Sequence, residues 1–375
     1  MAMPLSPKTV TLEAQVLDDA SSDNNVMANG DLKFTAEKGV NSSKVTYQEA
    51  SGAPVEKKSP LGYSVGWVTV VFLNMSKMIG TGVFSTPSTI LKGTGSVGLS
   101  LIYWFLGFLV AGSSLGVYLE FASYFPSRSG SEVVYLEQAY PRPKYFFPTA
   151  FAVQSVVLSF SSSNAIVLAQ YLFKLSSHSP SPWEQKGVAV AGYTVAVLFL
   201  VFSNRYSLMF SNAIGIVKLL TLIFISVTGL VVLGGHTSVK DPGTNFRHAF
   251  EGTPPSGYGV TNALVKVIFA YAGYENAFNM VNEVKNPIRT LRWSAPLSLF
   301  AVAVLYILTN IAFFSSSSKE DIETSKEVAA SVFFAKVFGE GGAAKALNFL
   351  ISLSAFGNLI AVLIGQSRLI RECGR

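Results

Sequence analysis

The sequence predicts an all-α polytopic membrane protein, and three observations lead to that class. Half of its 375 residues are hydrophobic and only 13% are charged, whereas an average soluble domain has roughly 25% charged residues. The apolar residues occur in blocks long enough to cross the hydrocarbon core of a bilayer, which takes about 20 residues of helix. The blocks lack the alternation of barrel strands, so each is expected to be a helix that satisfies its own backbone hydrogen bonds.

Residues 61–375 are predicted to form one transmembrane domain of about eight such helices. The apolar blocks run roughly over residues 63–92, 97–123, 146–174, 187–203, 206–234, 258–282, 293–315 and 343–367. Residues 1–60 differ in kind, because they are rich in Ser, Asn, Gly, Lys and Asp and have no sustained apolar period. They are predicted to be a disordered cytosolic tail.

Basic residues in the short connections predict the orientation. Counted from a cytosolic N-terminus, the inner loops are short and basic, so the positive-inside rule places the tail in the cytosol. These residues are Arg128, Arg142, Lys144, Arg205, Lys285, Arg289, Arg292, Arg368, Arg371 and Arg375. The basic excess is explained by orientation, and it does not call for a nucleic-acid partner.

The first block is interrupted at Met78-Ile79-Gly80-Thr81-Gly82. Two glycines around a threonine allow the helix to unwind, which leaves free N–H groups at the start of a second half-helix. Such a start carries a partial positive charge and suits a carboxylate. The alternative is that both glycines serve only close helix packing.

The sixth block contains a second interruption, over Ala272-Gly273-Tyr274 and the following Glu275-Asn276. Interrupted hydrophobic segments at corresponding positions of two halves indicate a transporter site. Blocks one and six are five apart, as an inverted five-plus-five repeat requires. The two breaks are therefore expected to be non-helical and adjacent.

Polar residues inside other blocks are further candidates. A lysine at mid-membrane is costly, so Lys218 in block five is expected to face protein or water rather than to snorkel to the interface. Glu120 ends block two and is a candidate gate or helix-end residue. The run Ser161-Ser162-Ser163-Asn164 in block three could line a cavity or form interhelical hydrogen bonds.

These motifs resemble the amino acid–polyamine–organocation superfamily in its L-type amino acid transporter branch, and within it the fungal high-affinity methionine permeases. The resemblance rests on four stretches in the same order: Gly80-Thr81-Gly82-Val83-Phe84, Ser129-Gly130-Ser131-Glu132 with its continuation to Glu137, Lys218-Leu219-Leu220, and Lys266 to Asn276 continuing to Pro287. They cover residues 60–375, and the tail matches nothing.

The family fold implies two inverted five-helix repeats plus two further helices, so the chain is expected to be truncated after helix 8. By the same resemblance, the N–H groups of Thr81 and Gly82 and the Thr81 hydroxyl hold the substrate carboxylate. Carbonyls near Met78 and Phe269 meet the amino group, and Phe269 is an aromatic lid.

Three further residues of the sixth block, Ala272, Gly273 and Tyr274, are implied to shape the side-chain pocket. Lys218 is implied to occupy the position of a sodium ion in related carriers, which favours proton symport or exchange. A titrating Lys218 is a hypothesis.

The resulting expectation is a plasma-membrane transporter for methionine or another neutral L-amino acid, without cofactor or metal. Some animal relatives pair with a glycoprotein through a cysteine in the outer loop after helix three. The corresponding loop here, Lys174 to Lys186, has none, so no disulfide-linked heavy subunit is expected. The lysine-bearing tail could meet the ubiquitin machinery or be a solvated tether.

Other functions remain open at this point. Polyamine, choline or γ-aminobutyrate transport, a non-transporting amino acid sensor and an inactive truncated permease are the alternatives. A membrane enzyme is disfavoured, because the only histidines, His178, His236 and His248, all fall in predicted outer loops and no nucleophile–base set is visible.

Overall fold

The computed structural model describes residues 62–373 with short gaps, together with residues 32–35 and 46–49 of the N-terminal segment. The gaps are residues 127, 141, 144–145, 159–160, 177, 203, 238, 240, 253–254, 326–328 and 340. In the N-terminal segment, β1 (Leu32–Thr35) pairs antiparallel with β2 (Thr46–Glu49). The rest of the predicted disordered tail lies outside the described residues.

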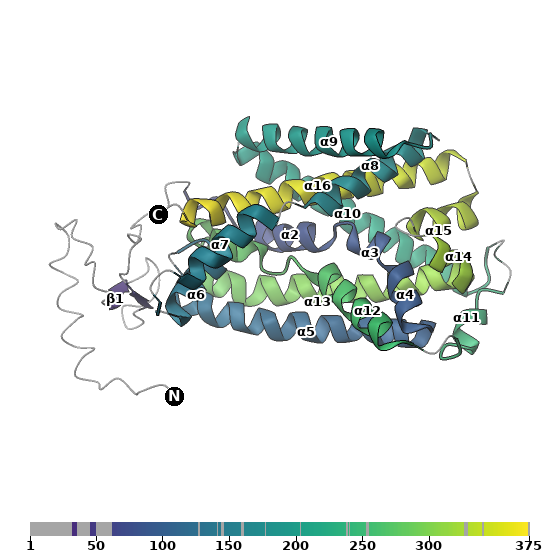
Figure 1. The fold of residues 1–375 in the computed structure, drawn as a ribbon, viewed down its shortest axis with the longest axis horizontal. Coiled ribbons are helices and arrows are strands. Elements are labelled where there is room, and N and C mark those ends of the chain that lie inside the picture. The colour runs from purple at the N-terminus through teal and green to yellow at the C-terminus, as the bar shows by residue number, and fades with distance from the viewer. Residues whose placement is uncertain are drawn as a thin grey trace.

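From Trp67 onward, the described chain is built of helices, most of which run side by side (Figure 1). In chain order they are α2 (Trp67–Met78), α3 (Gly82–Ser85), α4 (Pro87–Thr94), α5 (Val97–Tyr124), α6 (Glu132–Ala139), α7 (Phe146–Leu158), α8 (Ser162–Ser176), α9 (Pro182–Phe202), α10 (Asn204–Leu233), α11 (Thr244–Arg247), α12 (Gly257–Tyr271), the 3-10 helix η1 (Asn276–Glu283), α13 (Pro287–Ser316), α14 (Lys319–Thr324), α15 (Ala329–Phe338) and α16 (Gly342–Cys373).

Six helical segments of the described chain are long and apolar enough to cross a membrane, which confirms the prediction of an all-α integral membrane protein. They are Trp67–Ser85, Val97–Tyr124, Pro182–Phe202, Arg205–Leu233, Pro287–Ser316 and Gly342–Cys373. The third and sixth predicted blocks fall short because each is divided. Only 15 residues form α12, and η1 replaces the α-helix expected beyond Tyr274.

The prediction of one continuous helix over residues 146–174 was wrong. α7 ends at Leu158 and α8 begins at Ser162, and Ser161 between them has a φ of +29°. Serine side chains compete with the helix for backbone hydrogen bonds, so a run of serines is a weak point in a helix. The short helices α6, α11, α14 and α15 lie in connections for which the sequence predicted no helix.

The buried centre of the bundle contains α2, α13 and α16, and glycines let neighbouring helices approach them closely. A Cβ atom added to Gly229 of α10 would lie 2.1 Å from the Cβ of Ala312 on α13. One added to Gly357 of α16 would lie 2.3 Å from the Ile214 side chain on α10. Small residues at such crossings permit the backbone contact that drives helix association in lipid.

At the end of the bundle where α6 and the C-terminus lie (Figure 1), arginines predicted to mark inner loops are buried in ion pairs. Arg128 bonds Glu372 of α16 at 2.9 Å and Glu137 of α6 at 2.9 Å. Arg368 of α16 bonds Glu283 of η1 at 3.0 Å. These pairs tie α16 to η1 and to the connection that follows α5.

Candidate functional site

The first predicted break is present, since α2 ends at Met78 and α3 begins at Gly82. Its glycines are required by close neighbours. A Cβ atom on Gly80 would lie 2.4 Å from Nδ2 of Asn358, and one on Gly82 would lie 2.9 Å from the Cα of Ala270. At Gly82 the neighbour is backbone, so this segment can pass α12 closely only with glycine there, whereas a side chain at residue 80 would have to displace the Asn358 amide.

The second break is also present and lies against the first. α12 ends at Tyr271, and Gly273 has a φ of +129°, a backbone conformation that favours glycine. A Cβ atom on Gly273 would lie 2.6 Å from the backbone nitrogen of Met78. The expected juxtaposition of residues 78–82 with residues 272–274 therefore exists in the structure.

Lys218 holds the end of the first half-helix. Its Nζ donates to the carbonyl oxygens of Ser76 at 2.7 Å and Ile79 at 2.8 Å, and the side chain is fully buried. The C-terminal end of a helix carries a partial negative charge, which favours an ammonium group there. The structure thus places Lys218 of α10 against the unwound part of the first block, as the family resemblance implied.

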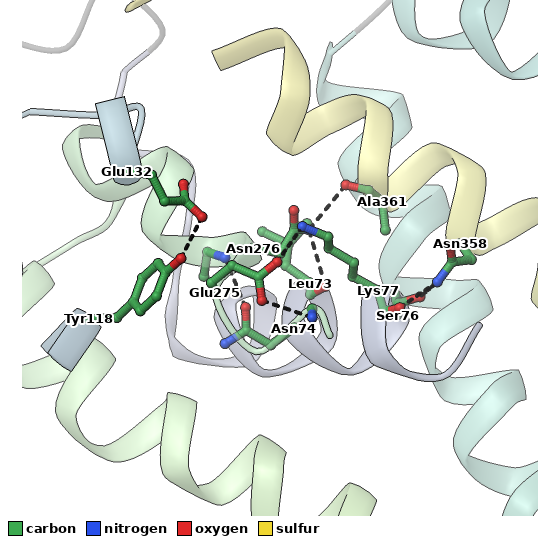
Figure 2. Close-up of polar contacts among 12 residues, drawn as sticks. Leu73, Asn74, Ser76, Lys77, Tyr118, Glu132, Glu275, Asn276, Asn358 and Ala361 are labelled. Atoms are coloured by element: carbon green, nitrogen blue, oxygen red, sulfur yellow. Dashed lines mark hydrogen bonds and ion pairs between the residues drawn. The ribbon is translucent and has the colours of Figure 1, made fainter. Parts of the chain in front are cut away.

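Two more side chains occupy the remaining carbonyls of this break. Nδ2 of Asn358 donates to the carbonyl oxygens of Ser76 at 3.1 Å and Lys77 at 2.5 Å (Figure 2). The Tyr306 hydroxyl donates to the carbonyl oxygen of Met78 at 2.5 Å and to that of Ala270 at 3.2 Å. Side chains from α10, α13 and α16 therefore replace the helical hydrogen bonds that α2 lacks at its end.

The backbone N–H groups on the other side of the break have no such partners. Among the described residues, none accepts a hydrogen bond from the N–H of Thr81, Gly82 or Val83. The Thr81 hydroxyl instead donates to Oδ1 of Asn164 on α8 at 2.8 Å. Unpaired donors at a helix start attract an anion.

A cavity of about 250 Å³ lies beside these donors. It is lined by six of the residues that the sequence nominated: Met78, Gly80, Thr81, Gly82, Phe269 and Ala272.

The other candidates lie outside this lining. The carbonyl oxygen of Ile79 accepts from Lys218, and Gly273 packs on Met78. The ring of Tyr274 packs edge-on against Tyr118 at 5.9 Å between centroids rather than lining the cavity. Glu120 is exposed near the end of α5 and does not join the site.

Sequence reasoning missed the part of the lining that comes from α16, which consists of Asn358, Val362 and Gln366. It left open the part at the start of α8, which consists of Ser161, Ser162, Ser163 and Asn164. The signal for α16 was present, because its three lining residues are spaced by four and so share one helical face. The serine run had been considered for a cavity, without a reason to prefer that interpretation over helix packing.

An ion pair joins the two broken helices beside the cavity. Nζ of Lys77, in the last turn of α2, lies 2.6 Å from Oε1 of Glu275, and Oε2 of Glu275 accepts from the backbone N–H of Gly273 at 2.8 Å (Figure 2). One turn earlier, Oδ1 of Asn74 accepts from the backbone N–H of Ala277 at 2.8 Å. The two breaks are thus fixed to each other by side chains as well as by glycine contact.

We expect Lys77→Met and Glu275→Gln each to lower the thermal unfolding midpoint, and the double variant to be more stable than either single variant. Removing one partner of a buried ion pair leaves the other charge unpaired, which costs about 3–5 kcal/mol, and these side chains are only 16% and 14% exposed. The measurement is thermal unfolding of the purified protein in lipid nanodiscs.

The pair Lys336–Asp321 is the matched control, since its atoms lie 3.1 Å apart but its side chains are 50% and 42% exposed. Neutralising one partner of this pair is expected to cost no more than about 1 kcal/mol. An equal loss of stability at both pairs would contradict the prediction that the ion pair of Lys77 and Glu275 contributes more to stability than an exposed one.

Several known proteins are similar to this chain in sequence. The model of the amino acid permease family matches residues 65–375. Relatives include the high-affinity methionine permease of Saccharomyces cerevisiae, 39% identical over 83% of this chain and 54% of the relative, and its low-affinity methionine permease, 29% identical over 84% and 58%. The b(0,+)-type amino acid transporter 1 of Mus musculus is 28% identical over 85% of this chain and 64% of its own length.

The chain therefore spans only about half the length of the methionine permeases it matches. The family match and these relatives confirm the resemblance drawn from the motifs. With the family model matching from Val65 to the last residue, this chain belongs to the amino acid permease family.

Proposed function

We propose that the protein is a secondary transporter of neutral L-amino acids, methionine foremost, that works by alternating access. The observation that carries the proposal is the set of unpaired N–H groups at Thr81, Gly82 and Val83 beside a cavity of about 250 Å³. Drug-sized ligands occupy pockets of roughly 300–1,000 Å³, so this cavity suits a smaller solute such as a single amino acid. The names of the two yeast relatives favour methionine.

The substrate carboxylate is proposed to lie at the start of α3, where backbone donors and the helix dipole both favour an anion. The ammonium group would lie at the end of α12. The carbonyl oxygen of Met78 already accepts from Tyr306 and from the N–H of Gly80. The carbonyl oxygen of Phe269 accepts from the N–H of Ala272 at 3.2 Å and keeps a second lone pair, so it is the better acceptor. The Phe269 side chain, 46% exposed and lining the cavity, can close over the bound substrate.

Sodium independence is part of the proposal. A sodium ion needs oxygen ligands, and the carbonyl oxygens of Ser76 and Ile79 already accept from the Lys218 ammonium. A fixed ammonium at this place supplies the positive charge that the ion would bring. Proton symport or exchange is accordingly proposed as the coupling mode, in the plasma membrane and with the N-terminus in the cytosol.

We propose that the protein acts without a disulfide-linked partner subunit. The connection between α8 and α9 contains no cysteine, and Cys373 at the end of α16 is the one cysteine of the sequence. An assay that compares reducing with non-reducing electrophoresis of the membrane-expressed protein should show no shift to a larger species.

The test of transport is uptake of labelled methionine, in competition with other amino acids, by cells that lack their own permeases. Both this chain and a version extended by the remaining helices of the family fold should be assayed. Gly82→Val is expected to abolish uptake, because its side chain would collide with the backbone of Ala270 and push α3 away from α12.

Gly112→Val on α5 is the control, since a Cβ atom there meets nothing within 4 Å. It should transport like the unmodified protein. If neither version takes up any amino acid while reaching the membrane in normal amounts, the proposed function is wrong.

A further inference from the structure

We propose that Asn164 and the first turn of α8 form the second wall of the carboxylate site, so that the substrate carboxylate is bound between α3 and α8. This inference rests on the proposed function and names a residue that binds the substrate directly. The hydrogen-bond donors that it assigns to the substrate lie in α8, outside the motifs of the first and sixth blocks.

The side chain of Asn164 is oriented by Thr81. Its Oδ1 accepts from the Thr81 hydroxyl at 2.8 Å, and the residue is 9% exposed and lines the cavity. Nδ2 is left with no acceptor among the described residues. The residue lines the cavity, and Nδ2 is not among the fully buried atoms without a partner, so this free donor is accessible to a ligand that accepts a hydrogen bond.

The backbone beside Asn164 points to the same kind of ligand. α8 is 15 residues long, and its first hydrogen bond runs from the N–H of Ala165 to the carbonyl oxygen of Ser161 at 3.1 Å. In the described chain, no group accepts from the N–H of Ser162, Ser163 or Asn164. Ser161 to Ser163 line the cavity, so this helix start, with its partial positive charge, borders the ligand space.

The two walls are complementary to one anion. On the first wall are the unpaired N–H groups at the start of α3, and on the second are Nδ2 of Asn164 and the start of α8. The described lining residues include one charged side chain, that of Lys77, which is cationic, and no aspartate or glutamate. A carboxylate has two oxygens and can accept from both walls at once.

The Thr81 hydroxyl takes a different part from the one first expected. The resemblance assigned it to the carboxylate, whereas in the structure it donates to Asn164. Thr81 is therefore a positioning residue through its side chain and a binding residue through its backbone, while Asn164 contacts the substrate itself.

The test measures binding by the purified protein in lipid nanodiscs, with methionine and methioninamide as ligands. Asn164→Asp keeps the acceptor for Thr81 but replaces the donor by a carboxylate. We expect methionine to bind at least about tenfold more weakly, because a hydrogen bond to a charged group is lost and two anions face each other. Methioninamide, which has no carboxylate and offers an N–H donor, should lose much less or bind more tightly.

Asn262→Asp is the matched control, because it makes the same change of charge on α12 at a residue that does not line the cavity. It should leave both affinities unchanged. A purely structural role of Asn164 would weaken both ligands equally, so the ratio of the two affinities is the decisive quantity.

Asn164→Leu serves if the aspartate variant does not fold. Its similar volume without a donor should also lower the preference for methionine over methioninamide. If the unmodified protein binds methionine and both variants keep its preference for the acid, the role of Asn164 is disproved while the proposed function stands. If the unmodified protein binds no amino acid, the proposed function itself is overturned.

Discussion

Replacing Lys218 with methionine is expected to abolish substrate binding and to lower the stability of the folded protein. The variant keeps the length of the side chain but removes the donor for the carbonyl oxygens of Ser76 and Ile79. Hydrogen bonds from a charged donor contribute about 1.5–3 kcal/mol to stability. Asn358 still donates to Ser76 at 3.1 Å and Ser354 to Ile79 at 3.4 Å, so the protein should fold while the break loses its fixed geometry.

The expected loss of affinity is at least about thirtyfold, which corresponds to about 2 kcal/mol of lost positioning. Equilibrium binding of methionine by the purified protein measures it, and thermal unfolding measures the accompanying loss of stability. Lys266→Met is the matched control, because Lys266 also lies in an apolar helix but does not line the cavity. Equal effects of the two substitutions would show that Lys218 has no special role at the site.

The same variant addresses the hypothesis that Lys218 takes part in proton coupling. If it does, the pH dependence of uptake should flatten in Lys218→Met together with the rate. Uptake that keeps the rate and pH profile of the unmodified protein would exclude Lys218 as the coupling group.

Substituting Gly273 by alanine is the second change expected to have a large effect, although it adds only one methyl group. A non-glycine residue at a φ of +129° is strained, and such strain costs about 1–3 kcal/mol. The new Cβ atom would also lie 2.6 Å from the backbone nitrogen of Met78. The clash involves backbone on both sides, so it cannot be relieved by turning a side chain.

The two breaks would therefore separate, and the distance between the carboxylate donors of α3 and the end of α12 would change. We expect Gly273→Ala to reach the membrane in reduced amount and to lose methionine binding in the fraction that folds. Gly116→Ala on α5 is the control, since a Cβ atom there meets nothing within 4 Å and helical alanine is unstrained. Normal binding by Gly273→Ala would mean that the contact between the breaks does not shape the site.

Much of the fold could be predicted because lipid allows few choices of backbone. Long apolar blocks must be helices there, and α5, α10 and α16 begin and end within a few residues of the predicted blocks, apart from the further extension of α16 to Cys373. The glycines at 80, 82 and 273 marked both interruptions correctly. Gly82 and Gly273 approach the backbone of a neighbouring segment and Gly80 approaches the Asn358 amide, so a residue without a side chain fits each position.

The rest of the site could not be predicted because it depends on which helices pack together. Asn358 contributes to the break only because α16 crosses α2, and nothing within block eight names the carbonyls that it meets. The division between α7 and α8 has no glycine or proline to mark it, so a serine run was all the sequence offered. Tyr274, expected in the pocket, faces Tyr118 because Gly273 turns the chain away from the cavity.

The carbonyl oxygens of residues 76–79, at the end of α2, accept hydrogen bonds from side chains of the protein itself. The site is accordingly preorganised, and its break does not depend on the ligand to stay open. Binding then loses little free energy to ordering the protein. In the proposed transport cycle, a small solute with few contacts could therefore be held selectively, and conformational energy would be used to move the helices rather than to form the site.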